Sequence, residues 1–309
     1  MRSPQKEVRE RAREDLYSAI LHQGSRCPAS ADAVPYLVPL AIDRATPERH
    51  EILTMLAELA VSLDPDLARR DTPPDDDPAY DAVREAVPVL LPLTTDRDPL
   101  VRAHAAHVLG WFPADSAAIA PALRGLIARD RDPGVVATAL LALSLLPPTG
   151  ESIELATRHF EAGRTRDVAA LALVALRGPQ APRPARIRVL ELRDARTRAP
   201  VPYRNGDLAA LAIEISERIA DDLADHKVTA LVDRLRKAAP TETFWIVSDL
   251  LEAAFATDPA PARRHTALSA IAALDPAAWR RGDLPDILRA WDLPTDRAAL
   301  ARVTVVRSP

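Results

Sequence analysis

The 309-residue sequence contains little cysteine, glycine and aromatic side chain. Its single cysteine, Cys27, excludes an internal disulfide bond and a zinc site built from several cysteines, and it favours a reducing compartment such as the cytoplasm. Nine glycines and an aromatic content of 4% argue against a β-sandwich or a β-barrel, which need glycine turns and aromatic strands. The 29 prolines indicate short helices separated by turns.

Long apolar runs and an excess of one charge are also missing. The longest apolar stretches, such as residues 137–146, are far shorter than the ~20 residues that span a bilayer, and the charged N-terminus does not have the pattern of a signal peptide. Forty Lys and Arg residues against 44 Asp and Glu give a net charge of −4, which disfavours non-specific nucleic-acid binding. We therefore expect a cytoplasmic protein with no membrane segment.

The chain contains internal repeats. Residues 33–40 and 86–93 align without gaps, and the Asp98-Pro99 pair returns 34 residues later as Asp132-Pro133. In each pair the aspartate is placed to accept the free N–H groups of a helix that the proline opens. The pattern predicts helical hairpins in which a short turn precedes each second helix.

After Asp98-Pro99, small and apolar residues recur at the spacing of one helix face, as Val101, Ala105, Ala106 and Leu109. A single hairpin cannot bury such a stripe, whereas stacked hairpins form a continuous core. Residues 88–112 resemble a HEAT repeat, residues 121–146 resemble a second copy, and weaker copies lie at 35–63, 153–176 and 250–274. The run that ends in His22-Gln23-Gly24 also resembles the opening of bacterial HEAT-repeat proteins. The resemblance implies an all-α, armadillo-like fold: a right-handed α-α superhelix (solenoid) of about six to seven HEAT-like hairpins.

Composition changes along the chain predict its organisation. Residues 1–176 are expected to hold the N-terminal repeats, with residues 64–81, which contain seven aspartates, as an acidic and exposed insertion loop. Residues 177–207 contain eight arginines and five prolines and are expected to connect these repeats to C-terminal repeats in 208–301. Residues 302–309 are expected to form a β-prone or disordered tail.

Three side chains of the best repeat, His104, His107 and Trp111, share one helix face at i, i+3 and i+7. By alignment, Met55 and Leu141 occupy equivalent positions in the neighbouring repeats. One interpretation is a groove that binds a peptide or a partner helix with these five residues. The other is that a tightly curved solenoid packs them into its own core or against another helix.

Other candidate sites have weaker sequence support. Arg183, Arg186 and Arg188 are candidate contacts for an anion, although codon usage explains their abundance as well. His104 and His107 lack the further ligands that zinc requires, so we expect neither a metal site nor a cofactor. Cys27 lacks an adjacent base, and no nucleophile, P-loop or dinucleotide motif is present, so we expect no catalytic residues.

These observations predict a non-enzymatic scaffold that binds a protein or peptide on the inner face of its repeats. Two alternatives stay open: nucleic-acid binding, as in HEAT-like DNA glycosylases, which the net charge disfavours, and an enzyme acting on a small metabolite or peptide with His104 or His107 as its base. The sequence predicts no membrane partner and gives no oligomeric state.

Overall fold

A computed structural model describes residues 1–22, 25–62, 77–193, 195, 197–216, 218–219, 223–239, 242–255, 261–279 and 283–305. Within these ranges most residues are helical, and the only sheet is an antiparallel pair of two-residue strands, β1 (Leu21–His22) and β2 (Ser25–Arg26). The prediction of an all-α fold is confirmed. The chain divides into two compact units, Met1–Ile219 and Ala220–Pro309.

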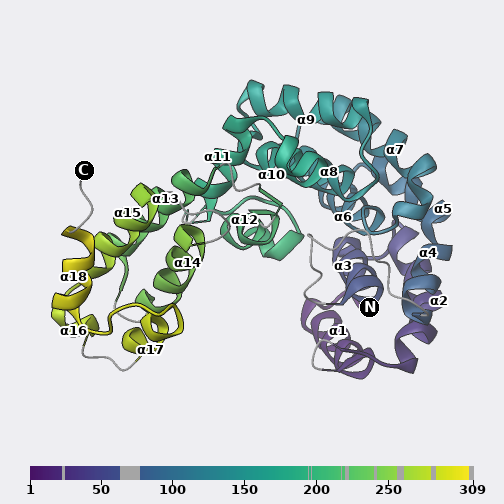
Figure 1. The fold of residues 1–309 in the computed structure, drawn as a ribbon. Coiled ribbons are helices and arrows are strands. Elements are labelled where there is room, and N and C mark those ends of the chain that lie inside the picture. Colours follow the sequence, from purple (N-terminus) through teal and green to yellow (C-terminus); the bar gives the residue numbers. More distant parts are fainter. Residues whose placement is uncertain are drawn as a thin grey trace. The chain divides into compact units, whose positions relative to one another are not determined.

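The first unit is a stack of helical hairpins that follows α1 (Lys6–Ile20) (Figure 1). The first helices of the hairpins form one row: α2 (Pro28–Ile42), α4 (Pro78–Glu85) continued by α5 (Val87–Leu90) and η2 (Leu91–Thr95), α7 (Ser116–Arg129), α9 (Gly150–Ala162) and α11 (Arg183–Leu192). The second helices form the inner row: α3 (Arg49–Val61), α6 (Pro99–Leu109), α8 (Pro133–Leu145), α10 (Arg166–Arg177) and α12 (Leu208–Ser216). Each second helix packs against its own first helix and against the next second helix, which is the arrangement of a solenoid.

The Asp-Pro pairs start α6 and α8 as predicted. The carboxylate of Asp98 accepts the N–H of Leu100 at 2.9 Å, and that of Asp132 accepts the N–H groups of Gly134 and Val135 at 2.8 and 3.2 Å. Proline occupies the first helical position, where its missing N–H removes a donor that would have no partner. The turn chemistry is therefore encoded locally.

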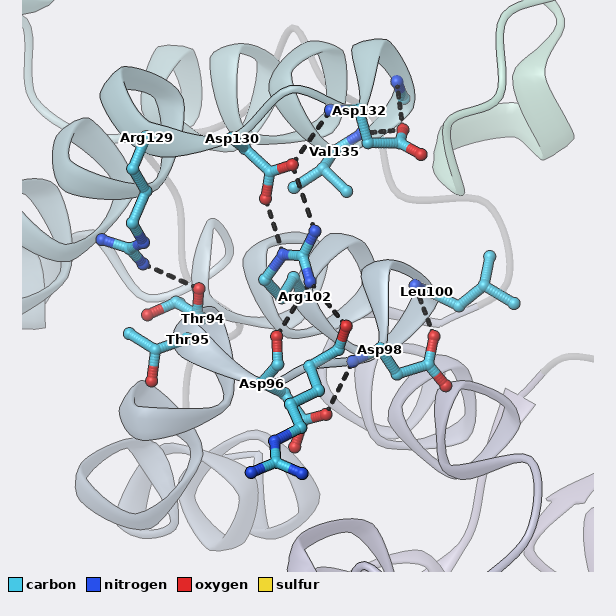
Figure 2. A network of polar contacts seen from close by, with 12 residues as sticks. Thr94, Thr95, Asp96, Asp98, Leu100, Arg102, Arg129, Asp130, Asp132 and Val135 are labelled. Carbon is cyan, nitrogen blue, oxygen red and sulfur yellow. Dashed lines mark hydrogen bonds and ion pairs between the residues drawn. The ribbon is translucent and has the colours of Figure 1, made fainter.

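Ion pairs join the turn of one repeat to the next (Figure 2). Arg102 donates to both carboxylate oxygens of Asp130 at 2.6 and 3.1 Å, and it also bonds the backbone carbonyls of Asp96 and Arg97. One repeat earlier, Arg49 donates to both oxygens of Asp96 at 3.0 and 2.9 Å. Hydrogen bonds from Arg49 hold the pKa of Asp96 below its ordinary value, so the buried carboxylate stays charged. Arg49 and Arg102 therefore occupy equivalent positions.

The core of the first unit is densest around α8 and α10. Every residue of α8 from Gly134 to Leu145 is buried, and so are residues 168–176 of α10. A helix that is apolar on all sides must be covered on all sides. The cover comes from α7, α9 and α11 in the first row, and from α12 and the segment before it on the other side.

The organisation differs from the prediction at three places. The predicted acidic loop at 64–81 lies mostly outside the described residues, but its end belongs to α4, which Asp77 caps. The predicted connecting segment 177–207 contains α11, which packs on α10 and α12, so the compact unit extends to Ile219. The predicted tail begins inside α18 (Arg297–Val305), whose first turn is capped by Asp296.

The second unit is also helical. It contains α13 (Ala224–Lys237), α14 (Thr243–Phe255), α15 (Pro261–Ala272), α16 (Pro276–Trp279), α17 (Asp283–Ala290) and α18. Helices α13, α14 and α15 pack on one another, and α17 and α18 complete the core. Leu250, Ile271 and Leu288 are fully buried at its centre. Its described elements are all helices, as predicted. The right-handed sense of the superhelix stays a prediction.

Candidate functional site

The predicted groove residues lie on the inner row, but most of them are not at the surface. Met55, His107, Trp111 and Leu141 are 4%, 8%, 8% and 1% exposed, and only His104 is partly accessible. The structure therefore differs from the expectation of an open apolar groove. These residues instead pack into the core, which was the other interpretation. They do so because another segment of the chain covers them.

Tyr203 covers the aromatic part of the inner row. It lies in the short 3-10 turn η5 (Tyr203–Gly206), between α11 and α12. Its ring centroid is 4.4 Å from that of His107, with the planes at 84°, and 5.9 Å from that of Trp111. His107 and Trp111 are themselves 6.2 Å apart. Centroid distances of this size, in two edge-to-face pairs and one tilted pair, are favourable for aromatic rings.

Burial leaves polar atoms of this aromatic cluster without partners. His107 Nδ1, Trp111 Nε1 and the Tyr203 hydroxyl are buried and make no hydrogen bond to any residue that the structure describes. Burial, reinforced by the nearby His104, lowers the pKa of His107 to about 3, so its imidazole is neutral at physiological pH. A buried and neutral histidine beneath Tyr203 has no access to a substrate.

A second part of the inner row is open and polar. On α3 the accessible polar side chains are His50, Glu51, Thr54 and Glu58, and on α6 His104 lies beside them. Thr54 Oγ1 is 2.8 Å from His104 Nδ1, and the rings of His50 and His104 are 5.4 Å apart. We call these five residues the open strip.

Aligning α3 with α6 by their equivalent arginines explains why the alignment of Met55 with His107 was wrong. Arg49 matches Arg102, so His104, His107 and Trp111 correspond to Glu51, Thr54 and Glu58. The sequence alignment had placed Met55 opposite His107, one residue after Thr54. Because neighbouring positions on a helix point about 100° apart, this shift replaces an apolar face by a polar one.

Burial tunes the titrating groups of the open strip. It raises the pKa of Glu58 to about 7, opposed by a hydrogen bond from Tyr17 of α1 and assisted by the charge of Glu51. It lowers the pKa of His104 to about 4, with a further contribution from His50. A hydrogen bond with His50 outweighs burial at Glu51 and lowers the pKa of that carboxyl. Near neutral pH the strip therefore presents one exposed carboxylate, one carboxyl near its midpoint and a neutral imidazole.

The three candidate anion contacts are not gathered into a site. Arg186 is buried and donates to the carbonyl of Ala181 at 3.0 Å. Arg188 pairs with Asp167 through two hydrogen bonds of 2.8 and 3.1 Å and also bonds Glu191. Arg183 is exposed. Two of the three guanidinium groups thus serve the packing of α10 and α11.

The remaining sequence candidates have local structural roles or fall outside the description. Cys27 precedes α2, where its N–H bonds Ser30 Oγ at 2.9 Å, and His22 belongs to β1, while Gln23 and Gly24 lie outside the described residues. Over the described ranges, no three His, Cys, Asp or Glu residues are placed to hold a metal ion. No helix in the same ranges is long and apolar enough to cross a membrane.

Sequence reasoning did not identify Tyr17, Thr54, Glu58 and Tyr203. Thr54 and Glu58 escaped because the register of α3 was read one residue late, whereas Tyr17 lies in α1, outside the repeats that the sequence showed. Tyr203 lies in a proline-rich stretch without helical periodicity, so no pattern predicted that it would return to α6.

The stacked hairpins agree with a comparison of the chain with protein families. A family described as HEAT repeats matches residues 79–144, which cover helices α4 to α8 and both Asp-Pro turns. Comparisons with curated proteins and with solved structures gave no match. HEAT repeats commonly mediate protein interactions. The matched segment is about a fifth of the chain and contains its clearest repeats, so the chain contains HEAT repeats.

Proposed function

We propose that this protein is a non-enzymatic scaffold that binds a protein or peptide partner through the open strip of His50, Glu51, Thr54, Glu58 and His104. The observation that carries the proposal is the contrast on one surface: the chain covers the apolar part of its inner row and leaves this polar part accessible. HEAT repeats commonly present such a surface to other proteins.

The open strip suits recognition of a polypeptide. It offers a carboxylate at Glu51, a carboxyl at Glu58 and the Thr54–His104 pair, which together accept and donate hydrogen bonds along two adjacent helices. Leu53 and Leu56 are fully buried beneath it and hold α3 rigid. A few directed polar groups on a rigid helical surface give register to a bound segment.

Neither alternative function has comparable support. An enzyme that uses His107 would need access to a side chain that Tyr203 covers, and His104 has a pKa of about 4 and is engaged with Thr54. Nucleic-acid binding through Arg183, Arg186 and Arg188 would need guanidinium groups that two of these residues use internally.

A photo-crosslinking experiment tests the proposal. A photoreactive amino acid replaces Glu51 in the open strip or, as a matched control, Glu154, an exposed glutamate of α9. We expect a defined crosslinked protein from position 51 in the source cells, and we expect Thr54→Arg in the same chain to reduce its yield at least tenfold. Equal yields from positions 51 and 154, or no effect of Thr54→Arg, would contradict the proposal.

A further inference from the structure

Four consecutive turns of the first unit carry an exposed arginine shortly before the second helix of the hairpin begins. These residues are Arg44 before α3, Arg97 before α6, Arg131 before α8 and Arg164 before α10, and we call them the turn arginines. The last three each lie two residues before their helix. Arg44 and Arg97 lie five residues before Arg49 and Arg102, which are equivalent. The turn arginines therefore occupy one repeated position.

The four turns lie side by side, because the second helices that follow them are stacked. Helix α3 packs on α6, α6 packs on α8, and α8 packs on α10. Two ion pairs, Arg49 with Asp96 and Arg102 with Asp130, join the first three turns to one another, and Figure 2 shows the guanidinium of Arg102 between two of these turns. Packed helices lie about 8–10 Å apart, so successive turn arginines follow one another along the edge at about that spacing.

The aspartates that precede the two middle turn arginines are already paired with other residues. Asp96 accepts two hydrogen bonds from Arg49, at 3.0 and 2.9 Å. Asp130 accepts two from Arg102, at 2.6 and 3.1 Å. Their negative charge is therefore used within the fold and does not compensate the turn arginines.

The guanidinium groups of the turn arginines face the solvent with little internal pairing. Within the part of the chain that the structure describes, Arg97, Arg131 and Arg164 have no hydrogen-bond or ion-pair partner for their side chains. The side chain of Arg44 is 70% exposed and makes one long contact, 3.9 Å, with Asp96. Four accessible cations thus lie along one edge of a chain whose net charge is −4. Such a local concentration of positive charge attracts an anionic partner.

A hollow of about 500 Å³ lies between the turns of α6 and α8. Arg129 and Arg131 line it, together with Thr95 and the paired side chains of the two turns. Arg129 donates through Nη2 to the carbonyl of Thr94 at 2.8 Å, as Figure 2 shows, and it pairs with no carboxylate of the described residues. An acidic side chain in this hollow would therefore meet two guanidinium groups that can each donate charge-assisted hydrogen bonds to it.

We propose that the turn arginines bind an extended, acidic segment of a partner protein, which places one carboxylate in the hollow between Arg129 and Arg131. An extended chain advances about 3.3 Å per residue, so about three residues span the distance between successive turns. The segment that fits best therefore has Asp or Glu at every third position. This surface is the turn edge of the repeats and not the open strip, so each proposal can fail without the other.

The turn edge suits an acidic polypeptide better than a nucleic acid. Asp98 and Asp132 directly follow Arg97 and Arg131 and are exposed, so carboxylates alternate with the turn arginines there. A nucleic-acid strand carries a phosphate about every 3.4 Å and would bring some of them against these carboxylates. Acidic side chains at every third residue can avoid them, and a carboxylate also matches the two parallel donors of a guanidinium.

The first test uses the unaltered chain, with its arginines labelled with ¹⁵N, and two synthetic peptides at low ionic strength. One peptide has four glutamates at every third position of a serine chain, and the other has the same composition with the four glutamates adjacent. We expect the spaced peptide to bind at least threefold more tightly and to shift the NMR signals of the turn arginine Nε–H groups. The signals of Arg11 and Arg183, two other exposed arginines, should stay in place. Equal affinities of the two peptides, or equal shifts at all of these arginines, would overturn the proposal.

Two double variants of the full chain provide the second test. Arg97→Gln with Arg131→Gln removes two turn arginines, and we expect at least a fivefold loss of affinity for the spaced peptide. Arg11→Gln with Arg183→Gln removes the same charge from exposed positions elsewhere in the first unit and should change the affinity less than twofold. Equal losses in the two double variants would mean that the peptide responds to net charge alone, and the proposal would be wrong. Tighter binding of an oligothymidine of the same length by the unaltered chain would also contradict it, because the edge would then favour a nucleic acid.

Discussion

The inner row has an accessible part at α3 and a covered part at α8. The same three helical positions are polar and accessible in the first part and buried in the second. In α3 these positions hold Glu51, Thr54 and Glu58. In α8 the positions 34 residues after His104, His107 and Trp111 hold Thr138, Leu141 and Leu145. The first set is accessible, and the second is buried. The helix α6 lies between them and is divided, since His104 joins the open strip while His107 and Trp111 lie under Tyr203.

The contrast between α3 and α8 shows that the polarity of a few helix positions decides where the inner row must be covered by another segment of the chain. Exposed leucines along α8 and α10 would present a continuous apolar surface, which soluble chains avoid outside binding sites. Residues 199–206, which precede α12, and α12 itself remove that surface from water. No such cover is required over α3, where carboxyl, hydroxyl and imidazole groups meet the solvent.

Acid pH should destabilise the covered part of the inner row, where His107 lies under Tyr203, before the open strip. The pKa of His107 falls from 6.5 in the unfolded chain to about 3 in the folded one because burial disfavours its charge. The unfolded state therefore binds more protons, and the free energy of unfolding should fall by roughly 4–5 kcal/mol as the pH drops from about 6.5 to 3. Denaturant unfolding between pH 7 and pH 3, monitored by circular dichroism, should show this loss.

The matched variant His107→Gln has no charge to gain and should show a flatter pH profile over the same range. If both chains lose stability in parallel below pH 6, then another group carries the acid sensitivity.

Alanine substitutions should change the free energy of unfolding much more in the aromatic cluster than in the open strip. Trp111→Ala removes a buried indole that contacts His107 and Tyr203, and it should lower the free energy of unfolding by about 3–5 kcal/mol. Glu51→Ala, in the open strip, should change it by less than about 0.5 kcal/mol. Urea titration of both variants measures the contrast. An effect of Trp111→Ala as small as that of Glu51→Ala would mean that the indole is not packed.

The elements that the sequence predicts well are those with local chemistry. Asp98 and Asp132 cap their helices through their own carboxylates, and Pro99 opens α6, so the hairpins and the stack could be foreseen from short motifs. The buried stripe of Val101, Ala105 and Leu109 follows from the helical period alone. The fold class is therefore accessible from sequence.

The surface could not be predicted in the same way, because it depends on contacts between distant segments. Tyr203 reaches His107 across 96 positions of the chain, and nothing in the proline-rich stretch around it encodes this return. The open strip was missed for a different reason. The first repeat lacks the Asp-Pro pair, and only the ion pair of Arg49 with Asp96 shows its correct register.

A rise of pH through neutrality should destabilise the open strip through Glu58. The pKa of Glu58 rises from 4.5 to about 7 because burial disfavours the carboxylate. The folded state therefore holds the proton more tightly than the unfolded state, and this stabilisation is fully present below about pH 4.5 and lost as the pH rises through 7. Its total size is about 3 kcal/mol. Glu58→Gln should stay neutral and unfold at a higher urea concentration than the unaltered chain at pH 8, with little difference at pH 5. A constant difference between pH 5 and pH 8 would show that Glu58 titrates normally.

The smallest expected effect concerns the hydrogen bond that links the two helices of the open strip. Thr54→Val keeps the shape of the side chain but removes the hydroxyl that lies 2.8 Å from His104 Nδ1. The net contribution of such a bond is about 1 kcal/mol, so thermal stability should change little. Partner binding should fall more than stability, because His104 loses the contact that fixes its ring and, with it, the tautomer that a partner meets. Thr229→Val, at an exposed threonine of α13 that bonds its own helix backbone, is the matched control. Heteronuclear NMR of the His104 ring nitrogens reports the tautomer directly, and an unchanged nitrogen shift in Thr54→Val would show that Thr54 does not set it.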